Sequence, residues 1–426
     1  MTRASTILLA DGLSMVDDQY RSALPAERLA DGLGRLLDDA SKRLSSGGLL
    51  LLSGTAASLL QLPKHAPKPH TKSIPPAISC ATRTGWTSKG AELRPWTRFT
   101  KDGQTIILGV LDWMTADRMP MLEMWPEETA ANLVTWQRHA GTSYWGTPGV
   151  AGTALLRSLH AGKKNEPRWQ PRPPRGLDYI IERDLNWQAP SASTAGLTRQ
   201  TYDTNAMYLA AESAGLLPVG ALERQTSLEL DRTRAGLHLI ETQRWAESRI
   251  PAPAAWGMPD GPMRMWVATP TLILLDDLAE HGRVDAGYVI REQWTAPARR
   301  LMRPWAEIVR DMVYPTIADT NGAPIWAPGT VSAGVRTAAK AAYRETWGML
   351  AREGGRIFRP DWASIILAHA RCTLWRKLWA VGNKQGLWPT EILTDAVTYL
   401  TRETDPILAL PAGWQIGSGL GKWKIK

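Results

Sequence analysis

Two separated aspartates, Asp203 and Asp395, are the residues of this sequence best placed to carry chemistry. Asp203 lies between a predicted strand and a predicted helix, Met207–Ala214, and such a position can project a carboxylate into a cleft. Asp395 lies within residues 391–400, whose alternating pattern predicts a single strand built for burial. A carboxylate buried in a strand is costly unless it is paired, hydrogen-bonded or bound to a metal. Capping a helix is the simpler role for Asp203. The cost of burying the Asp395 carboxylate favours a functional role for that residue.

A predicted helix between the two aspartates, residues 334–352, carries cations and aromatic rings along one side. At about 100° per residue, five of its side chains fall in one arc: Arg336, Lys340, Tyr343, Arg344 and Trp347. The neighbouring side is apolar, which predicts that it packs against the rest of the protein. The polar face could hold a triphosphate and stack a base. A solvated cationic face is the alternative that needs no ligand.

A second basic stretch, residues 162–176, combines cations with prolines and Trp169. Its basic residues are Lys163, Lys164, Arg168, Arg172 and Arg175. Cations interleaved with an aromatic ring suit a segment that lies along a phosphate backbone. A solvated linker explains the same composition equally well. Residues 420–426 form a further basic segment, which includes Lys422 and Lys424.

The composition of the whole chain narrows the class of protein. Its 426 residues are enough for two or three domains, and a net charge of +9 favours a polyanionic partner such as nucleic acid. Two cysteines exclude a disulfide scaffold and a cysteine-rich zinc module. No HExxH, Walker A or GxGxxG motif occurs, so metalloprotease, ATPase and dinucleotide-enzyme functions have no support. No apolar stretch is long enough to span a bilayer, and we expect a cytoplasmic, nucleoid-associated protein.

Strands and helices alternate around these residues, which indicates a mixed α/β fold. Toward the N-terminus we expect an amphipathic helix over 24–44, a domain boundary in the proline-rich linker 62–77, a buried strand over 105–113 that 119–125 could pair with, and a helix over 127–139. Farther along, the pattern predicts a helix over 228–250, and a buried strand leading into a helix over 268–278.

The two aspartate motifs resemble those of family B DNA polymerases, in the divergent and truncated form of protein-primed enzymes from phages or linear plasmids. The run from Asp203 to Tyr208 resembles the family's first motif, in which an Asp and two further residues precede Ser-Leu-Tyr-Pro. Thr394-Asp395-Ala396 resembles the second half of the family's Asp-Thr-Asp-Ser motif. The two motifs occur in the same order as in the family.

The predicted cationic helix resembles the fingers helix of the same family. Lys340 and Gly348 keep the family's Lys and Gly in register, and Trp347 replaces its Tyr. Residues 365–378 resemble the palm helix that precedes the third motif, and residues 420–426 resemble the basic strand that follows it. Three motifs in the family's order are more specific than any one of them.

The resemblance implies an α/β (α+β) fold with a degenerate ribonuclease H-like exonuclease domain, then a family B palm with fingers, and a thumb that is missing or minimal. The implied domains are an N-terminal helical extension with its Pro/Lys linker (1–78), the exonuclease-like domain (79–175), a first palm segment (176–218), an insertion module (219–330), the fingers helix (331–352) and a second palm segment (353–426). An exonuclease needs an Asp-x-Glu pair to hold two metals. Residues 91–160 contain none, so proofreading is expected to be absent.

The resemblance also implies a role for each candidate residue. Asp203 and Asp395 would hold two Mg²⁺ (or Mn²⁺) ions for nucleotidyl transfer. The nucleotide would be bound by Lys340, Arg336, Tyr208, Arg344 and Trp347, with Tyr208 beneath the sugar. DNA would be bound by Lys422, Lys424, Lys163, Lys164, Arg168, Arg172 and Arg175. The implied partners are primer-template or single-stranded DNA, a dNTP, and a terminal (priming) protein or a clamp.

Departures from the family pattern leave other functions open. Ala206 replaces the Ser of the first motif, Leu209 replaces its Pro, and Leu393 replaces the first Asp of the third motif. These changes favour a non-catalytic, polymerase-derived protein that binds DNA ends or a terminal protein. An unrelated basic α/β protein is a third alternative. The polymerase hypothesis requires that Asp203 and Asp395 face each other on adjacent antiparallel strands.

Overall fold

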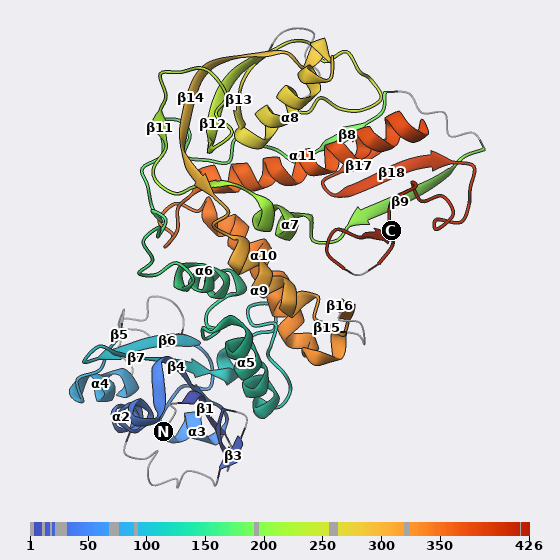
Figure 1. Ribbon diagram of the computed structural model, residues 1–426. Helices are drawn as coiled ribbons and strands as arrows, with labels where there is room; N and C mark the ends of the chain where they lie inside the picture. The colour runs from blue at the N-terminus through green and yellow to red at the C-terminus, as the bar shows by residue number, and fades with distance from the viewer. Residues whose placement is uncertain are drawn as a thin grey trace. The chain divides into compact units, whose positions relative to one another are not determined.

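The computed structural model describes most of the chain as a mixed α/β protein (Figure 1). The described residues are 4–10, 13–17, 19–21, 32–67, 76–88, 93–190, 196–254, 263–318, 324–417 and 419–426. They divide into two compact units, one made of Met1–Ser158 with Asp311–Thr346, the other of Leu159–Arg310 with Trp347–Lys426. Within these ranges no helix is both long and apolar enough to cross a membrane.

The first unit is built on a seven-stranded sheet in the order β3-β2-β1-β4-β7-β6-β5. The strands are β1 (Ala4–Ala10), β2 (Leu13–Val16), β3 (Gln19–Arg21), β4 (Leu44–Leu52), β5 (Thr87–Ser88), β6 (Trp96–Lys101) and β7 (Gln104–Val110). The three central strands, β1, β4 and β7, are parallel. Their leucine and isoleucine side chains are buried on both faces, which is typical of a parallel sheet covered by helices.

Helices of the first unit pack against this sheet: α2 (Leu33–Arg43), α3 (Thr55–Leu59), α4 (Pro76–Arg83) and α5 (Pro126–Ala140). The helix α6 (Pro148–Ser158) also belongs to this unit, where the Gly149 N–H donates to the Glu345 carboxylate at 2.9 Å. A short hairpin of β15 (Thr316–Ala318) and β16 (Pro324–Trp326) also belongs here. The helix α9 (Arg303–Val313) and the helix α10 (Ala333–Leu350) contribute residues to both units.

Several predictions for the first unit are confirmed and others are wrong. The helix α5 and the strand β7 occupy the predicted positions, and β7 ends in a 3-10 turn, Leu111–Trp113. The predicted helix 24–44 is described from Leu33 only, and residues 22–31 lie outside the described residues. Residues 119–125 form turns instead of a strand. Met119 and Met121 are buried there, so the apolar signal reflects burial of side chains and not strand pairing.

The second unit is built on two sheets. One sheet has the order β19-β9-β18-β17-β8, and the other has the order β10-β14-β12-β13 with β11 paired to β14. The strands of the first sheet are β8 (Asn186–Gln188), β9 (Thr198–Thr204), β17 (Glu391–Leu393), β18 (Ala396–Thr401) and β19 (Trp423–Ile425). Those of the second are β10 (Leu217–Pro218), β11 (Glu223–Arg224), β12 (Arg234–Thr242), β13 (Met263–Ala268) and β14 (Tyr288–Arg299). All their pairings are antiparallel.

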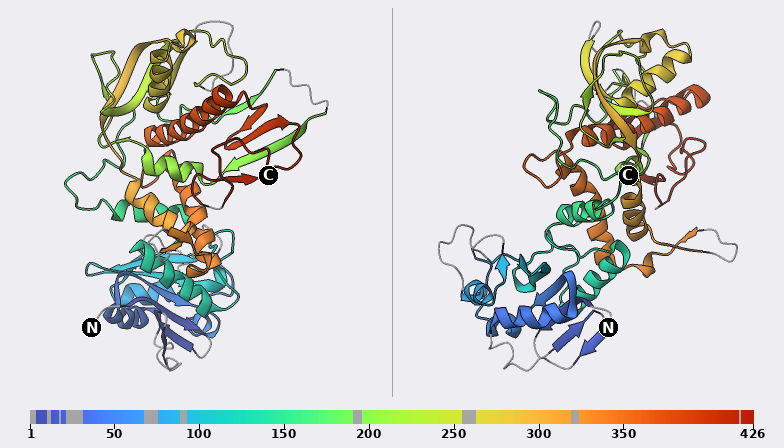
Figure 2. Two further views of the ribbon diagram at one scale, coloured as in Figure 1. Left: turned by 45° about the vertical axis from the view of Figure 1, so that its right-hand side comes forward. Right: turned by 60° about the vertical axis from the view of Figure 1, so that its left-hand side comes forward.

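The helix α11 (Pro360–Gln385) is the core element of the second unit. It packs against α7 (Met207–Ala214) and α8 (Thr269–Glu280), and Figure 1 shows it running between them. Figure 2 shows the same helix beside the sheet that carries the C-terminal strand. Most of its side chains are buried, including Trp362 and Trp375. The predicted strand and helix around Asp203 are confirmed as β9 and α7.

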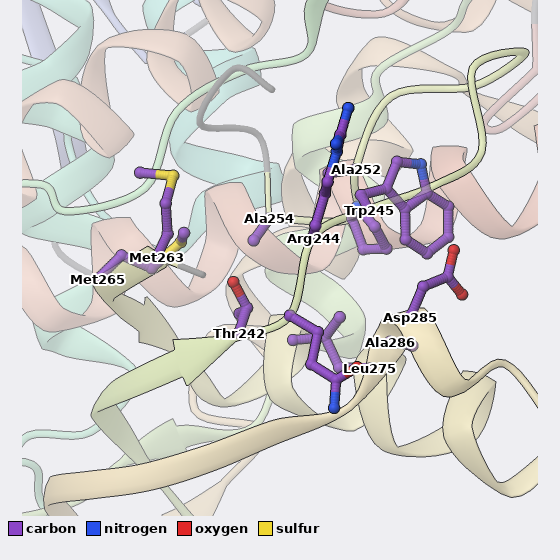
Figure 3. A pocket seen from close by; sticks show the side chains of 12 residues that line it. Thr242, Arg244, Trp245, Ala252, Ala254, Met263, Met265, Leu275, Asp285 and Ala286 are labelled. Atoms are coloured by element: carbon purple, nitrogen blue, oxygen red, sulfur yellow. The ribbon is translucent and has the colours of Figure 1, made fainter. Parts of the chain in front are cut away.

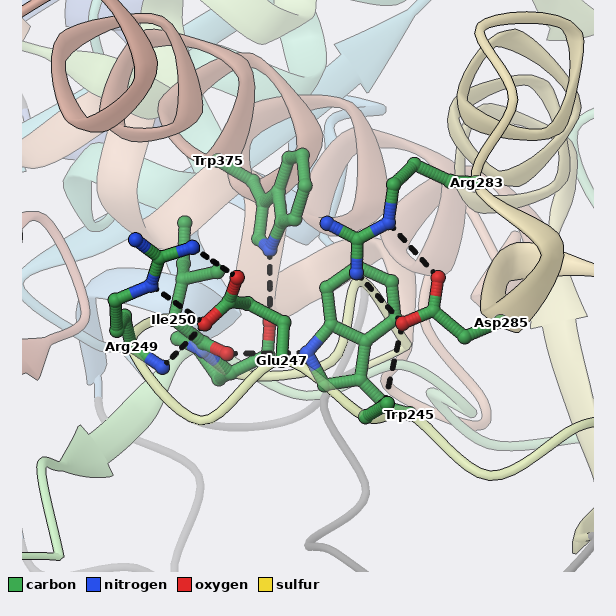
Figure 4. A network of polar contacts seen from close by, with 9 residues as sticks. Trp245, Glu247, Arg249, Ile250, Arg283, Asp285 and Trp375 are labelled. Carbon is green, nitrogen blue, oxygen red and sulfur yellow. Dashed lines mark hydrogen bonds and ion pairs between the residues drawn. The ribbon is translucent and has the colours of Figure 1, made fainter.

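A polar network fixes the loop 243–254, which follows β12 (Figure 4). Asp285 accepts hydrogen bonds from the Arg283 guanidinium and from the backbone N–H of Ala246. The indole N–H of Trp245 donates to the Ile250 carbonyl at 3.1 Å. The predicted helix over 228–250 is wrong, because the strand β12 occupies 234–242 and the residues on either side form irregular loops.

One buried carboxylate in this unit, that of Glu212, lacks the hydrogen bonds within the described part of the chain that would offset the cost of burying its charge. Glu212 on α7 is fully buried, and neither of its carboxylate oxygens has a hydrogen-bond partner among the described residues. Burial therefore raises the pKa of Glu212 well above its ordinary value.

Replacing Glu212 by methionine is expected to stabilise the protein, by about 1–3 kcal/mol at pH 8. The folded-state pKa is raised, so the wild-type carboxyl contributes stability at low pH and loses it as the pH rises through that pKa. The gain of the variant should therefore be smaller at pH 5 than at pH 8 in urea unfolding. Glu212→Gln removes the charge and keeps a polar group, so comparing it with Glu212→Met shows which of the two accounts for the gain in stability. A variant no more stable than wild type at pH 8 would contradict this account.

Candidate active site

Asp203 and Asp395 meet at one end of the sheet β19-β9-β18-β17-β8. The strand β9 runs antiparallel to β18, with Asp203 opposite Ala396, the residue after Asp395. The backbone N–H of Thr204 donates to the Asp395 carbonyl at 3.1 Å, which locks the two segments together. The structure thus brings the two predicted carboxylates side by side.

Asp395 lies in a tight turn and not inside a strand, which corrects the prediction of one strand over 391–400. Leu393 pairs with Ala396, so Thr394 and Asp395 form a two-residue hairpin loop between β17 and β18. Thr394 has a φ of 60°, the left-handed conformation that such short loops demand. The loop lifts the Asp395 carboxylate out of the ladder toward Asp203.

The electrostatics of the pair favour an added cation. Burial, and then the charge of Asp203, raise the pKa of Asp395 to about 6. The Oδ1 atom of Asp203 is buried without a hydrogen-bond partner, while its Oδ2 atom lies 3.6 Å from Lys426 Nζ and 3.9 Å from Lys424 Nζ. Carboxylate oxygens are the ligands that Mg²⁺ prefers, so these side chains fit a divalent cation. Among the described residues, no three His, Cys, Asp or Glu side chains cluster as a metal site.

Tyr208 is held beside the pair by a residue that the sequence did not reveal. Its hydroxyl donates to the carboxylate of Asp184, and its ring centroid lies 5.6 Å from that of Trp347. Burial, the hydrogen bond to Asp184 and the nearby charge of Asp395 raise the pKa of Tyr208, which keeps the hydroxyl protonated. Ala206, with a φ of 50°, starts the helix that carries Tyr208.

The position of Asp184 follows from pairing that is distant in sequence. Strand β8 begins at Asn186, which pairs with Leu393, and the Leu185 carbonyl accepts from the N–H of Thr394. Asp184 is therefore brought to the hairpin loop by the sheet. No local sequence motif marks Asp184, because its place beside Tyr208 results from the pairing of β8 with β17.

The basic C-terminal strand lies directly against the carboxylates. In β19, Lys424 pairs with Asp203 across the ladder. The Lys422 carbonyl accepts a hydrogen bond from the Asn205 N–H at 2.8 Å, and its side chain lines a separate pocket. Lys426, which the sequence did not single out, comes closer to Asp203 than Lys424 does.

The cationic helix is confirmed as α10, and its charged face is accessible. Lys340 and Arg344 are exposed and Arg336 is half-buried, whereas the alanines on the neighbouring side are buried. These three cations are counted in the first unit, and the carboxylates in the second. Of the α10 residues that are predicted to bind the nucleotide, Trp347 belongs to the same unit as the two carboxylates.

The basic segment 162–176 is irregular, and its cations face solvent. Lys163, Lys164, Arg168, Arg172 and Arg175 are all exposed. Trp169 instead packs inward: its ring contacts those of His160 and Trp362, and its N–H donates to Glu166. The Trp169 ring is therefore engaged within the protein, and binding of a phosphate backbone by the surrounding cations stays a prediction.

A small cavity at the ends of β12 and β13 can be set aside as a catalytic site (Figure 3). It is lined by apolar side chains such as Met263, Met265 and Leu275, with Asp285 at its edge. Its volume of about 30 Å³ suits a single water molecule. Asp285, the acidic residue among its described lining, is already engaged by Arg283.

Comparisons with known proteins bear on the fold alone. No protein-family model matches this chain, and no curated protein matches it. Among solved structures, Phi29 DNA polymerase complexed with primer-template DNA and incoming nucleotide substrates is similar, with a TM-score of 0.51 and 12% identity over 97% of this chain and 81% of that chain. Phi29 DNA polymerase complexed with primer-template DNA alone aligns with a TM-score of 0.49 and 13% identity, over 96% of this chain and 80% of that one. The chain has a polymerase-like fold.

Proposed function

We propose that this chain is a family B-type DNA polymerase that performs template-directed DNA synthesis by two-metal nucleotidyl transfer on a mobile or linear replicon. The observation that carries the proposal is the meeting of Asp203 and Asp395 on adjacent segments of one antiparallel sheet, with a buried carboxylate oxygen left unpartnered. The polymerase-like fold supports it. Proofreading is not included in the proposal, because residues 91–160 lack the Asp-x-Glu pair.

In this mechanism the chain's own residues would position the substrates and neutralise the charge of the phosphates. Asp203 and Asp395 would hold Mg²⁺ or Mn²⁺, which when bound supplies charge stabilisation for the transferring phosphate. Asp395 must give up its proton to serve as a ligand, and its raised pKa makes this step dependent on pH. The ring of Tyr208, fixed through Asp184, would lie beneath the sugar. That Lys340 neutralises the triphosphate stays a prediction from the resemblance.

A non-catalytic function in binding DNA ends or a terminal protein is the second candidate, and two observations favour it. Lys424 and Lys426 already approach Asp203, and some of its charge is balanced without a metal. Leu393 is 55% exposed at the position where the family motif has its first Asp, which removes one ligand. A protein of this kind would bind DNA through its basic segments and extend no primer.

The test is single-nucleotide incorporation on a short primed DNA, first with Mg²⁺ and then with Mn²⁺. DNA binding is measured separately by fluorescence anisotropy in the absence of metal. Incorporation directed by the template base supports the polymerase. DNA binding without incorporation under either metal favours the second candidate. Failure to bind DNA at all would exclude both.

The discrimination against ribonucleotides should depend on the Asp184–Tyr208 hydrogen bond. Asp184→Ala is expected to free the ring of Tyr208 and to lower the preference for a dNTP over the matching rNTP about tenfold, equal to about 1.4 kcal/mol. Asp184→Asn keeps an acceptor for the hydroxyl and should retain most of the preference. Steady-state incorporation of both nucleotides measures the ratio. An unchanged ratio in Asp184→Ala would show that Tyr208 does not contact the sugar.

A further inference from the structure

A basic pocket lies between the end of α11 and the segments 412–415 and 420–423, wholly within the second unit. Its volume is about 460 Å³, which is ample for phosphate groups. Three lysines line it, Lys377 and Lys384 from α11 and Lys422 from the C-terminal segment, together with Trp414 and Trp423. No aspartate or glutamate is among its described lining residues.

The walls of this pocket are fixed by specific contacts. The Gln385 side chain accepts from the Ala412 N–H at 2.9 Å and donates to the Ala412 carbonyl at 3.1 Å, which joins the two walls. Trp414 stacks on Trp423 with the ring centroids 3.6 Å apart. A side chain at Gly417 would come within 2.7 Å of Lys422 Cδ, so this glycine leaves room for the lysine stem.

The charge of the pocket has no internal balance. Lys377 is half-buried, with its amine 5.6 Å from the centroid of the Trp423 ring, and burial lowers its pKa. Three amines around one cavity repel one another, and no carboxylate of the described lining offsets them. Lys384 and Lys422 are exposed, so an anion bound among the three would relieve their repulsion and the cost of burying Lys377.

We propose that this pocket binds phosphate groups of a nucleic-acid strand, as an anchoring site separate from the Asp203–Asp395 pair. The choice of nucleic acid as the phosphate source rests on the proposed function and on the net charge of +9. The pocket wall is joined to the carboxylate site, because the Asn205 N–H donates to the Lys422 carbonyl and the Asn205 carbonyl accepts from the Gly421 N–H. A strand held here would therefore steady β19 and the cations beside Asp203.

The test uses the full chain carrying Asp203→Asn and Asp395→Asn, so that DNA binding is measured without the carboxylate pair. In this background, Lys377→Gln, Lys384→Gln and Lys422→Gln are combined. Binding of a fluorescent single-stranded DNA should weaken at least tenfold near about 100 mM salt, and the slope of log affinity against log salt should fall by about 2. The control combines Lys64→Gln, Arg83→Gln and Arg118→Gln, exposed cations of the first unit, and carries the same charge change.

Each outcome decides the proposal. A slope and affinity equal to those of the control would overturn it. If inorganic tripolyphosphate quenches tryptophan fluorescence only when the three lysines are present, while DNA binding is unaffected by their loss, the site is for a small polyphosphate and the nucleic-acid assignment fails. Circular dichroism establishes that the variants fold, and the charge-preserving triple arginine variant should restore binding. If the affinity depends on the three lysines and the chain with Asp203 and Asp395 intact extends no primer, this inference is supported and the polymerase is rejected.

Discussion

Replacing Asp203 or Asp395 by asparagine is expected to lower primer extension by about a thousandfold or more, equal to about 4 kcal/mol of the barrier. The amide keeps the size of the side chain and loses the charge that would hold the divalent cation. Neither change should disturb the sheet, since the β9–β18 ladder is made by backbone groups. Single-nucleotide incorporation measures the loss, and anisotropy should show DNA binding within about twofold of wild type.

Glu391→Gln is the matched control for both variants. Glu391 lies in the same hairpin as Asp395, but it is partly exposed and forms an ion pair with Arg199, away from the pair of aspartates. Extension by this variant should stay close to wild type. A second readout is independent of activity: Mn²⁺ binding followed by calorimetry should strengthen from pH 5 to pH 7.5, because the metal competes with the proton on Asp395. Near-normal extension by either asparagine variant would remove the basis of the two-metal proposal.

Arg371→Leu is expected to destabilise the second unit by about 3–5 kcal/mol, because it would leave a buried carboxylate without its cation. Arg371 and Glu182 are almost completely buried, and their nearest nitrogen and oxygen are 2.6 Å apart. Glu182 also accepts from the Ala268 N–H at 2.7 Å and from the Thr271 hydroxyl at 2.8 Å. The pair thereby ties the segment before Asp184 to the helices α8 and α11.

Arg376→Leu provides the control on the same helix. Arg376 forms an ion pair with Asp277 at 2.8 Å, but both side chains are partly exposed, and such pairs contribute about 0–1 kcal/mol. Urea unfolding followed by tryptophan fluorescence compares the two variants. Combining Arg371→Leu with Glu182→Leu should recover some of the loss, since no unpaired charge then remains. Equal costs for the Arg371 and Arg376 changes would show that the buried pair adds nothing.

The sequence predicted best those elements whose signal is local. Helices α7 and α10 and strand β9 were expected from periodicity, and their positions agree with the structure. The strand β12 was mistaken for a helix because it is buried on both faces, which removes the alternation that distinguishes a strand. Charged residues in the preceding turns strengthened the wrong interpretation.

The two aspartates that the structure brings together were singled out from the sequence, whereas the residues around them were not. The alternation over 391–400 continues across the loop of Thr394 and Asp395, so the pattern could not reveal the hairpin. Asp184 and Lys426 reach the site through β8 and β19, whose pairing joins residues far apart in sequence. Periodicity within a segment carries no information about such contacts.

The charge near Asp203 depends on how the lysine side chains at the three-residue strand β19 move, as well as on their presence. This strand lies at the edge of the sheet and pairs with β9 alone in the order of strands. Trp423 holds the strand in place, because it is 2% exposed and its ring stacks on that of Trp414. The side chains of Lys424 and of Lys426, which follows the strand, are instead 54% exposed, and exposed lysine stems change rotamer readily. Each such change takes an amine away from Asp203 and leaves its carboxylate open to another cation, so the two lysines act as tethered counter-ions.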